Sequence, residues 1–346
     1  MSIASPTVQA AAMAAMNTEK DFFANVLFPR CPIIGAALKP GDNTYRGTAY
    51  KVSRNQNIAP DEVSDEYIVG VPANTIPVTL EDYEVSSKLH HLATQESLKS
   101  LPTLGRFGID NWLSDVAAPT VMGRLLIKRE LRALTVATTT GNYAANTAGN
   151  WADTTSDPIE QIQLAFRTIQ PIFRPDSSVH EFVLCFSMDA WHAFVNNPAV
   201  RARFAATQNS PANPADVIAY LTGVMRVGND IPMRIHVASA SQQAGNIGQN
   251  ATPAYILSNK AMLVCNAKSN TAALNDLNFS ENLAARAQAD LRIRSWGRGY
   301  VMLDPTIRTF EVEDNDIMKV VGEHATTDTI FDASGGYLWT APASNA

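Results

Sequence analysis

Between residues 151 and 198, the hydrophobic positions predict a helix, a buried strand and a second helix in succession. Asp157 suits the N-cap of the first helix and Pro158 its first position, while Glu160 completes a capping box. The apolar residues of this helix recur three or four positions apart and form one stripe: Ile159, Ile162, Phe166 and Ile169. Pro171 and Pro175 are expected to break the helix before the strand begins.

Residues 182–186 form a continuously apolar run that is short enough for a buried strand. Ser187 follows as the predicted N-cap of the second helix, which an Asn-Pro pair ends. The inward face of this helix is predicted to carry Met188, Trp191 and Val195. We therefore expect Phe166 and Trp191 to be core residues of one domain, packed between the two helices.

The longest predicted helix covers residues 107–138, with a kink or a late start at Pro119. Its apolar surface is formed by Val121, Leu125, Ile127, Leu131 and Leu134. Its other side carries a row of basic residues with one carboxylate: Arg124, Lys128, Arg129, Arg132 and Glu130. This row is expected to be a polar face, either solvated or paired with a neighbouring subunit.

Alternation at a period of two predicts strands in much of the remaining chain. Between residues 49 and 85, three prolines argue against a central sheet position and favour edge strands or a projecting hairpin. Long antiparallel strands are predicted at 286–296 and 308–321, and shorter ones at 224–227, 233–237, 255–257, 261–265 and 335–339. Short helices are predicted at 199–206 and 214–221, and polar loops at 141–150 and 239–252. These elements together indicate an α+β protein.

The composition bears on function more than on fold. Only 17% of the 346 residues are charged, so part of the surface is either covered by other subunits or neutral and polar. A net charge of −6 argues against direct recognition of nucleic acid, which needs a basic face. Residues 1–16 lack the basic start of a signal peptide, and no apolar run is long enough for a membrane span.

Sequence patterns typical of catalysis or of nucleotide binding are absent. His90 and His91 are adjacent and would point to opposite faces of a strand, so surface positions are favoured over a shared metal. Asp314 and Asp316 resemble the start of a calcium loop but lack its glycine and its bidentate glutamate.

Gly297 and Gly299 flank Arg298 in an expected turn between strands, which is weak evidence for phosphate binding. Three scattered cysteines, Cys31, Cys185 and Cys265, are too few for a disulfide framework or a zinc site and fit a reducing cytoplasm. Cys185 lies in the apolar run and is interpreted as a core residue rather than a nucleophile. We expect no catalytic residue, no cofactor and no metal.

The order of these elements resembles a known family. An Asp-led helix, a buried strand, a Ser-x-Asp-x-Trp turn into a helix (residues 187–191) and the Asn197-Pro198 stop resemble the core domain of tailed-bacteriophage major capsid proteins, which share the Hong Kong 97 type of capsid fold. The likeness is closest over residues 151–204. The resemblance implies an α+β chain with four parts: an N-terminal arm (1–48), an extended loop (49–85), a peripheral domain with a long spine helix (86–150 and 286–325) and an axial core domain (151–285 and 326–346).

The resemblance also implies a function and partners. Copies of such a chain assemble into hexamers and pentamers of an icosahedral shell, made in the bacterial host cytoplasm, that encloses double-stranded DNA in the virion without sequence-specific binding. A portal and a decoration protein are possible partners, and no membrane is involved. Fewer than 50 residues precede the expected loop, so a separate scaffolding protein is expected. The alternatives are an encapsulin-like nanocompartment shell protein, another phage structural protein such as a tail-tube subunit, and an enzyme, for which the sequence has no positive feature.

One contact between subunits can be suggested from charge. The expected loop carries four carboxylates, on Asp61, Glu62, Asp65 and Glu66. The late strands carry five arginines: Arg286, Arg292, Arg294, Arg298 and Arg308. We expect the acidic residues to meet an arginine-bearing surface of an adjacent subunit. The alternative is an ordinary solvated turn.

Overall fold

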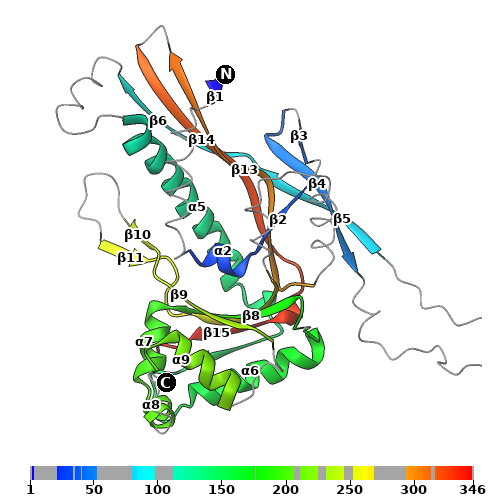
Figure 1. Cartoon of the computed structure of the whole chain (residues 1–346), viewed down its shortest axis with the longest axis vertical. Coiled ribbons are helices and arrows are strands. Elements are labelled where there is room, and N and C mark those ends of the chain that lie inside the picture. The colour runs from blue at the N-terminus through cyan, green and yellow to red at the C-terminus, as the bar shows by residue number, and fades with distance from the viewer. Residues whose placement is uncertain are drawn as a thin grey trace, which may run out of the picture.

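A five-stranded mixed sheet forms the centre of one part of the molecule, drawn in the lower half of Figure 1. The computed structural model describes residues 2–3, 22–33, 36–39, 41–52, 80–97, 112–175, 177–205, 211–224, 231–244, 252–268, 294–312 and 316–344. The strands of this core sheet lie in the order β7 (Ala145–Gly149), β15 (Gly336–Ala341), β12 (Ala261–Ala267), β8 (His180–Ser187) and β9 (Met233–Ala238). β8 is antiparallel to β12 and parallel to β9, and β15 is parallel to β7.

The predicted buried strand is therefore confirmed as β8, a strand with a neighbour on each side. Helices cover the lower face of the core sheet in Figure 1: α6 (Pro158–Phe173), α7 (Met188–Asn196), α8 (Pro198–Ala205) and α9 (Pro214–Ala219), which continues as η3 (Tyr220–Val224). Asp157 caps α6 by accepting hydrogen bonds from the amides of Ile159 and Glu160, as predicted.

The predicted break of α6 is wrong at Pro171, although the helix has ended before Pro175. The helix continues to Phe173 and ends where Arg174 adopts a left-handed conformation with φ 49°. Pro171 is exposed and lies in the last turn, so its ring points away from the core and costs the helix little.

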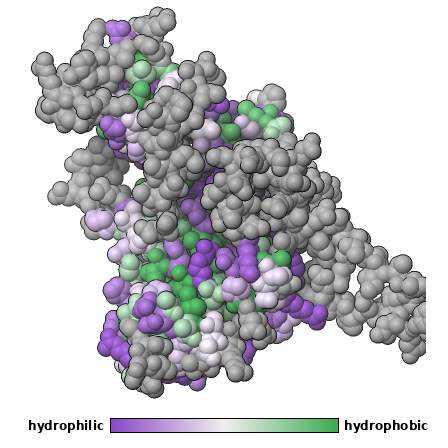
Figure 2. Space-filling view, in the orientation of Figure 1, coloured by the Kyte–Doolittle hydropathy of each residue, from purple (hydrophilic) through white to green (hydrophobic). Residues whose placement is uncertain are grey.

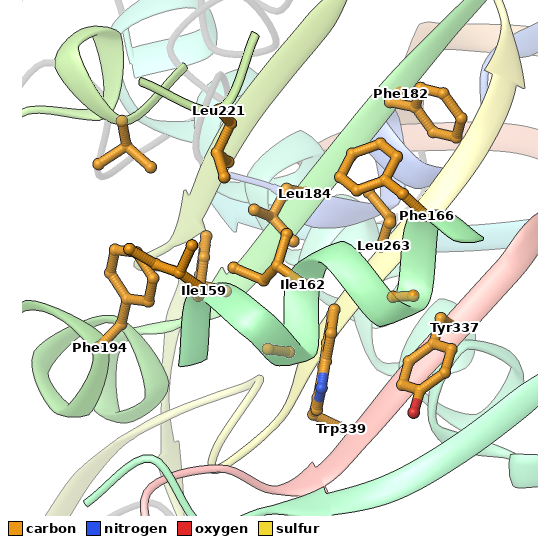
Figure 3. Close-up of a cluster of buried hydrophobic side chains, with 14 of the residues drawn as sticks. Ile159, Ile162, Phe166, Phe182, Leu184, Phe194, Leu221, Leu263, Tyr337 and Trp339 are labelled. Carbon is orange, nitrogen blue, oxygen red and sulfur yellow. The ribbon is translucent and has the colours of Figure 1, made fainter. Parts of the chain in front are cut away.

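The core of this part is aromatic. Figure 3 shows Ile159, Ile162 and Phe166 of α6 turned towards Leu184 and Phe182 of β8, with Leu263 and Trp339 from the neighbouring strands. Phe166 meets Phe182 edge to face with ring centroids 4.7 Å apart. Phe166 is thus a core residue, as expected.

Trp191 lies at the edge of this core rather than inside it. The fully buried residues of α7 are Ala190 and Phe194, and the predicted inward face of Met188, Trp191 and Val195 is only half-buried. The helix is rotated because Ala190 and Phe194, four residues apart, fill the space next to Phe186. The Trp191 ring stacks on Phe194 at 5.8 Å and flanks Phe186 at 5.2 Å.

The second part of the molecule is built on a long antiparallel hairpin. Its strands β13 (Gly297–Val312) and β14 (Ile317–Ile330) join β6 (His90–Ser97), β1 (Ser2–Ile3) and β2 (Arg30–Pro32) in one sheet. Long antiparallel strands do occur in this region, but the predicted positions are wrong: 286–296 precedes β13, and 308–321 spans the end of β13 and the start of β14. Pro305 lies where the β13–β14 register shifts between Leu303 and Thr306, an irregularity that tolerates a proline in a paired strand. Residues 286–293 of the predicted strand lie outside the described residues, and the strand begins only at Gly297.

The predicted long helix lies along this hairpin in Figure 1. It consists of η1 (Leu113–Ala117) followed by α5 (Ala118–Thr138). The chain is already helical before Pro119, so the late start predicted there is wrong; Pro119 lies in the first turn of α5, where the π-helical turn is followed by the α-helix. Residues 107–111 of the prediction lie outside the described residues. The buried stripe runs through Val121, Leu125, Ala133 and Ala137, whereas Ile127, Leu131 and Leu134 are only half-buried. Small alanines allow close packing, and this rotates the helix from the predicted face.

A short helix, α2 (Phe23–Leu27), packs between the two parts. It contacts α5, β8, β9 and β13. Phe23, Leu27 and Phe28 are fully buried in a cluster that also contains Val183, Cys185 and Trp296. Figure 1 shows α2 across the core sheet from α6. The chain near the N-terminus is therefore part of the joint between the hairpin and the core sheet.

Two sheets are smaller. β3 (Ala37–Lys39), β4 (Thr44–Val52) and β5 (Leu80–Lys88) form one that projects from the body in Figure 1. β10 (Ser241–Ala244) and β11 (Thr252–Tyr255) form the other, where a polar loop was predicted at 239–252. The loop predicted at 141–150 is also wrong, since it contains η2 (Thr140–Asn142) and β7. The sequences of β7 and β10 have few β-branched or aromatic residues, so these segments become strands because they pair with a neighbouring strand.

The remaining short elements agree with prediction within a few residues. α8, α9, β9, β12 and β15 occur as expected, and η5 (Ala333–Gly335) supplies the predicted turn before β15. β11 ends at Tyr255, earlier than the strand predicted at 255–257. Of the strand predicted at 224–227, Val224 ends η3 and the rest lies outside the described residues. The α+β class is confirmed.

Candidate functional site

The predicted basic row of α5 is divided between surface and interior. Arg124 and Lys128 are exposed, but Arg129 is buried. Its guanidinium donates two hydrogen bonds to Asp328 of β14, Nε to Oδ2 at 3.1 Å and Nη2 to Oδ1 at 2.7 Å, and a third from Nη1 to Asn25 at 2.7 Å. The expectation of a solvated or intersubunit face is wrong for Arg129, because β14 and α2 provide its partners within the same chain.

Glu130 is also buried, with 1% of its surface exposed. Its two carboxylate oxygens accept hydrogen bonds from the backbone amides of Phe23 and Ala24, at 2.7 and 3.0 Å. A side chain of α5 thus caps the N-terminus of α2. The sequence held a signal for this contact, since the residue before α2 is Phe22, which has no side-chain acceptor.

Burial raises the pKa of Glu130 to about 7, against the opposing effect of the two amide hydrogen bonds and of Arg129. Removing a carboxylate from water disfavours its charged form more than these contacts favour it. The carboxyl group at the joint between α2 and α5 therefore titrates near neutral pH.

His90 and His91 differ in environment. His91 is exposed, as expected, but His90 is half-buried and its ring lies 5.3 Å from that of His324 on β14. Arg132 of α5 completes the group, with Nη2 3.4 Å from Nε2 of His324. The surface position predicted for His90 is wrong because β6 pairs with β14 and places the two histidines opposite each other.

Gly297, Arg298 and Gly299 lie in the first residues of β13 and not in a turn, so the prediction is wrong. A Cβ on Gly297 would lie 2.9 Å from the Leu27 carbonyl oxygen, and one on Gly299 would lie 2.9 Å from that of Phe28. The glycines therefore allow the end of α2 to pack on β13. Arg298 is buried with its guanidinium 4.3 Å above the Phe331 ring, an arrangement that leaves no phosphate-binding loop here.

All three cysteines are buried thiols that form no disulfide. Burial raises the pKa of the Cys185 and Cys265 thiols. The interpretation of Cys185 as a core residue is confirmed by its complete burial on β8. A buried thiol held in its neutral form is a poor nucleophile.

The late arginines do not form one surface. Arg294 is mostly buried and donates to Asp332 from Nη2 at 2.6 Å and from Nε at 3.1 Å. Arg298 is buried as described above. Arg308 is about one third exposed and pairs with Glu323 at 3.3 Å. The expected arginine-bearing surface is thus wrong for Arg294 and Arg298. Arg286, Arg292, the four loop carboxylates and Asp314 lie outside the described residues.

The projecting sheet is anchored at its base. Ala49 of β4 and Val85 of β5 are buried against Cys31, Ile33 and Tyr300. The two strands stay in register to their far end, where Val52 pairs with Leu80. β3 is exposed along its whole length, including the apolar Leu38. In the view of Figure 2, hydrophobic and hydrophilic residues are interspersed over the part below this sheet.

Over the described ranges, no three His, Cys, Asp or Glu side chains gather as metal ligands would. None of the helices in those ranges is both long and apolar enough to cross a membrane.

Comparison with known proteins identifies the fold. No protein-family model matches the sequence, and neither does any curated protein. A crystal structure of a phage-related protein from Bordetella bronchiseptica RB50 is similar over 100% of both chains, with a TM-score of 0.62 and 14% identity. A virus-like particle from Pyrococcus furiosus (TM-score 0.47, 12% identity, 96% of each chain) and the capsid of cyanophage P-SCSP1u (0.48, 9%, 92% of this chain and 87% of that one) are also similar. These last two scores are too low to support an inference. The chain has the α+β fold of the Bordetella phage-related protein along its whole length, and the predicted resemblance to a phage protein is confirmed at the level of the fold.

Proposed function

We propose that the chain is the major capsid protein of a tailed bacteriophage, of the Hong Kong 97 type. The observation that carries the proposal is the architecture shared over the full length with a phage-related protein. A long helix lies along a long hairpin, a core sheet is joined to them, and a β4–β5 sheet projects from the body. A projecting three-stranded sheet has little core of its own, so an adjacent copy would bury its free face.

The four parts expected from the resemblance are retained as part of the proposal. They are the arm (1–48), the extended loop (49–85), the peripheral domain (86–150 and 286–325) and the axial domain (151–285 and 326–346). α5 and most of the β13–β14 hairpin fall within the proposed peripheral domain. The helices α6 to α9 fall within the proposed axial domain.

The proposed partners follow from shell assembly. Copies of the chain form hexamers and pentamers of an icosahedral shell, which encloses double-stranded DNA without reading its sequence. A scaffolding protein assists assembly in the host cytoplasm, and a portal and a decoration protein complete the virion capsid. Repetition of one contact by symmetry gives even a weak pairing a large effect on the closed shell.

The test is electron microscopy of the purified chain, alone and with candidate scaffolding proteins. Closed shells of uniform size support the proposal, whereas open tubes would favour a tail-tube subunit. Particles made in cells are then opened and their contents measured. Double-stranded DNA supports a virion shell, and an enclosed enzyme would favour an encapsulin-like nanocompartment.

A second experiment removes the projecting loop without disturbing its base. Because Val52 pairs with Leu80, residues 53–79 can be replaced by Asn-Gly, which closes a two-residue hairpin turn. We expect an unchanged melting temperature and no closed shells. The matched control replaces the same residues by a Gly/Ser segment of equal length. It keeps the length of the segment and changes only its sequence, so the two effects can be told apart. Normal shells from the shortened chain would refute the assembly role of the loop.

A further inference from the structure

Five basic side chains meet where α5 crosses the start of β6. They form a group that we call the basic cluster: Lys88, His90, Lys128, Arg132 and His324. The His90 ring lies 5.3 Å from the His324 ring, and Arg132 Nη2 lies 3.4 Å from His324 Nε2. Lys88 and Lys128 are exposed beside them, near enough for their charges to lower the pKa of His90.

Within the described ranges, the three permanent cations of the basic cluster have no salt-bridged carboxylate. Among the described residues, Lys88, Lys128 and Arg132 form no salt bridge. The nearby carboxylate, Asp328, is held by two hydrogen bonds from Arg129. Like charges repel, and this gathering occurs in a chain with a net charge of −6. Such an arrangement is stabilised when an anion binds.

The contact between Arg132 and His324 has a defined direction. An arginine can only donate, so His324 Nε2 accepts from Arg132 and the ring proton lies on Nδ1. That Nδ1 is buried without a hydrogen-bond partner in the described part of the chain. His324 therefore positions the guanidinium of Arg132, which is half-buried and has further N–H groups to donate.

We propose that the basic cluster binds a phosphate group, either free inorganic phosphate or a phosphate of a nucleic acid backbone. Arg132 offers planar paired donors, and Lys88 and Lys128 offer mobile ammonium groups, which together match a tetrahedral oxyanion. His90 adds a ring nitrogen at the half-buried side of the site. This inference does not depend on the proposed shell function, because it rests on side chains of a single subunit.

Anion binding here is coupled to protonation of His90. In the free protein, burial and then Arg132, Lys88, His91 and Lys128 lower the pKa of His90 to about 4. Burial and then Arg132, His90 and Arg129 lower that of His324 to about 3. Asp328, paired with Arg129, is the carboxylate facing this side of α5. A bound anion offsets the positive field and raises the pKa of His90, so affinity must increase as the pH falls towards 4.

The first experiment measures binding of sodium phosphate and of a short DNA duplex to the full chain by calorimetry, against sodium chloride at equal ionic strength. Sulfate, which stays a dianion, serves as the probe between pH 7.5 and 5. We expect saturable phosphate binding and at least about a threefold gain in sulfate affinity on acidification. Binding of phosphate alone would assign a free anion, and binding of the duplex alone would assign a nucleic acid backbone.

Variants locate the site. The pair Lys88→Gln and Lys128→Gln changes two exposed side chains and should weaken binding about tenfold or more with the melting temperature unchanged. Arg132→Gln should abolish it. The matched control is Arg124→Gln, which removes one charge from an exposed position on the same helix and should bind as the native chain does. Equal affinity in all variants, or heats explained by ionic strength alone, would overturn the proposal.

Discussion

The two parts of the molecule are held together by different kinds of contact. Side chains buried around the core sheet are mainly aromatic and aliphatic, with three tryptophans fully buried in the described chain. The core sheet has a few buried ionisable groups, such as Asp332 paired with Arg294. Around α5 and the β13–β14 hairpin they are more numerous: Arg129, Glu130, Arg298, His324 and Asp328. Apolar side chains can shift slightly against one another with little loss of stability, because the hydrophobic effect is non-directional. Hydrogen bonds between charged groups require defined distances and angles.

This difference indicates what each part must achieve. The core sheet needs stability, which non-directional burial supplies. The long helix, the long hairpin and α2 must keep fixed relative positions over a small contact area. The contacts of Arg129 and Glu130 tie α5 to β14 and to α2 at defined points. In the proposed shell, such fixed positions matter because every copy repeats the same contacts.

The largest expected effect lies in the apolar part. Trp151 is fully buried against Phe186, Phe194 and Trp339, with ring centroids 5.3–6.1 Å apart. Trp151→Ala should reduce the free energy of unfolding by about 3–5 kcal/mol through cavity formation. Trp191→Ala, at the edge of the same core, should cost about half as much. Chemical denaturation measures both, and a larger loss at Trp191 would mean that the core is centred on α7 instead.

The next effect tests the buried charges. Asp328→Ala removes both hydrogen bonds that Arg129 donates to this carboxylate, while the bond from Nη1 to Asn25 stays. The expected cost is about 3 kcal/mol, mostly from the loss of the buried counter-charge. The double variant Arg129→Met with Asp328→Leu removes both charges and should recover most of that loss. If the double variant is as unstable as the single one, the charge pair contributes through shape and not through pairing.

The sequence predicted the apolar part better than the charged part, for a physical reason. Helix caps and apolar stripes are local, so Asp157 with α6 and Ser187 with α7 could be placed from neighbouring residues. Burial of Arg129 and Glu130 depends on partners about 100 to 200 residues away. A row of charges on a helix is usually solvated, and nothing local marks the exceptions.

A similar limit applies to the strands. β8 is buried on both sides and its apolar run identifies it, but β7 becomes a strand only because β15 lies beside it. Among the elements that the proposed assembly would use, the long helix and the projecting β4–β5 hairpin were both expected from the sequence. It did not predict the basic cluster, because that cluster forms only when β6 pairs with β14.

Replacing a glycine by alanine should have opposite effects on stability at two positions, one in each part. At Gly336 in β15, a Cβ would lie 2.4 Å from Nε1 of Trp296, so Gly336→Ala should destabilise the fold by about 1–3 kcal/mol. At Gly123 in α5, a Cβ would meet no atom within 4 Å, so Gly123→Ala should stabilise by about 0.5–1 kcal/mol through helix propensity. The melting temperatures of the two variants, compared with that of the native chain, test both expectations. Destabilisation by Gly123→Ala would point to a requirement for glycine in α5 beyond space.

The last prediction is a pH dependence at the joint between the two parts. Glu130 has a pKa near 7 in the folded chain, above the ordinary value of 4.5 that applies when it is unfolded. A raised pKa means that the folded state holds the proton more tightly. The stabilisation from this proton is complete below about pH 4.5 and is lost as the pH rises through about 7.

Glu130→Gln isolates this contribution, since the variant keeps the size of the side chain and does not titrate. The free energy of unfolding of the native chain minus that of the variant should fall between pH 4.5 and 7, by no more than about 1.4 kcal/mol per pH unit, and should level off above pH 7. Other titrating groups near α5 cancel in the difference. A difference that rises with pH would mean that the amides of Phe23 and Ala24, together with Arg129, keep the carboxylate ionised despite its burial. In that case the cap on α2 would be a charged contact, and α2 would detach from α5 on acidification instead of on alkalinisation.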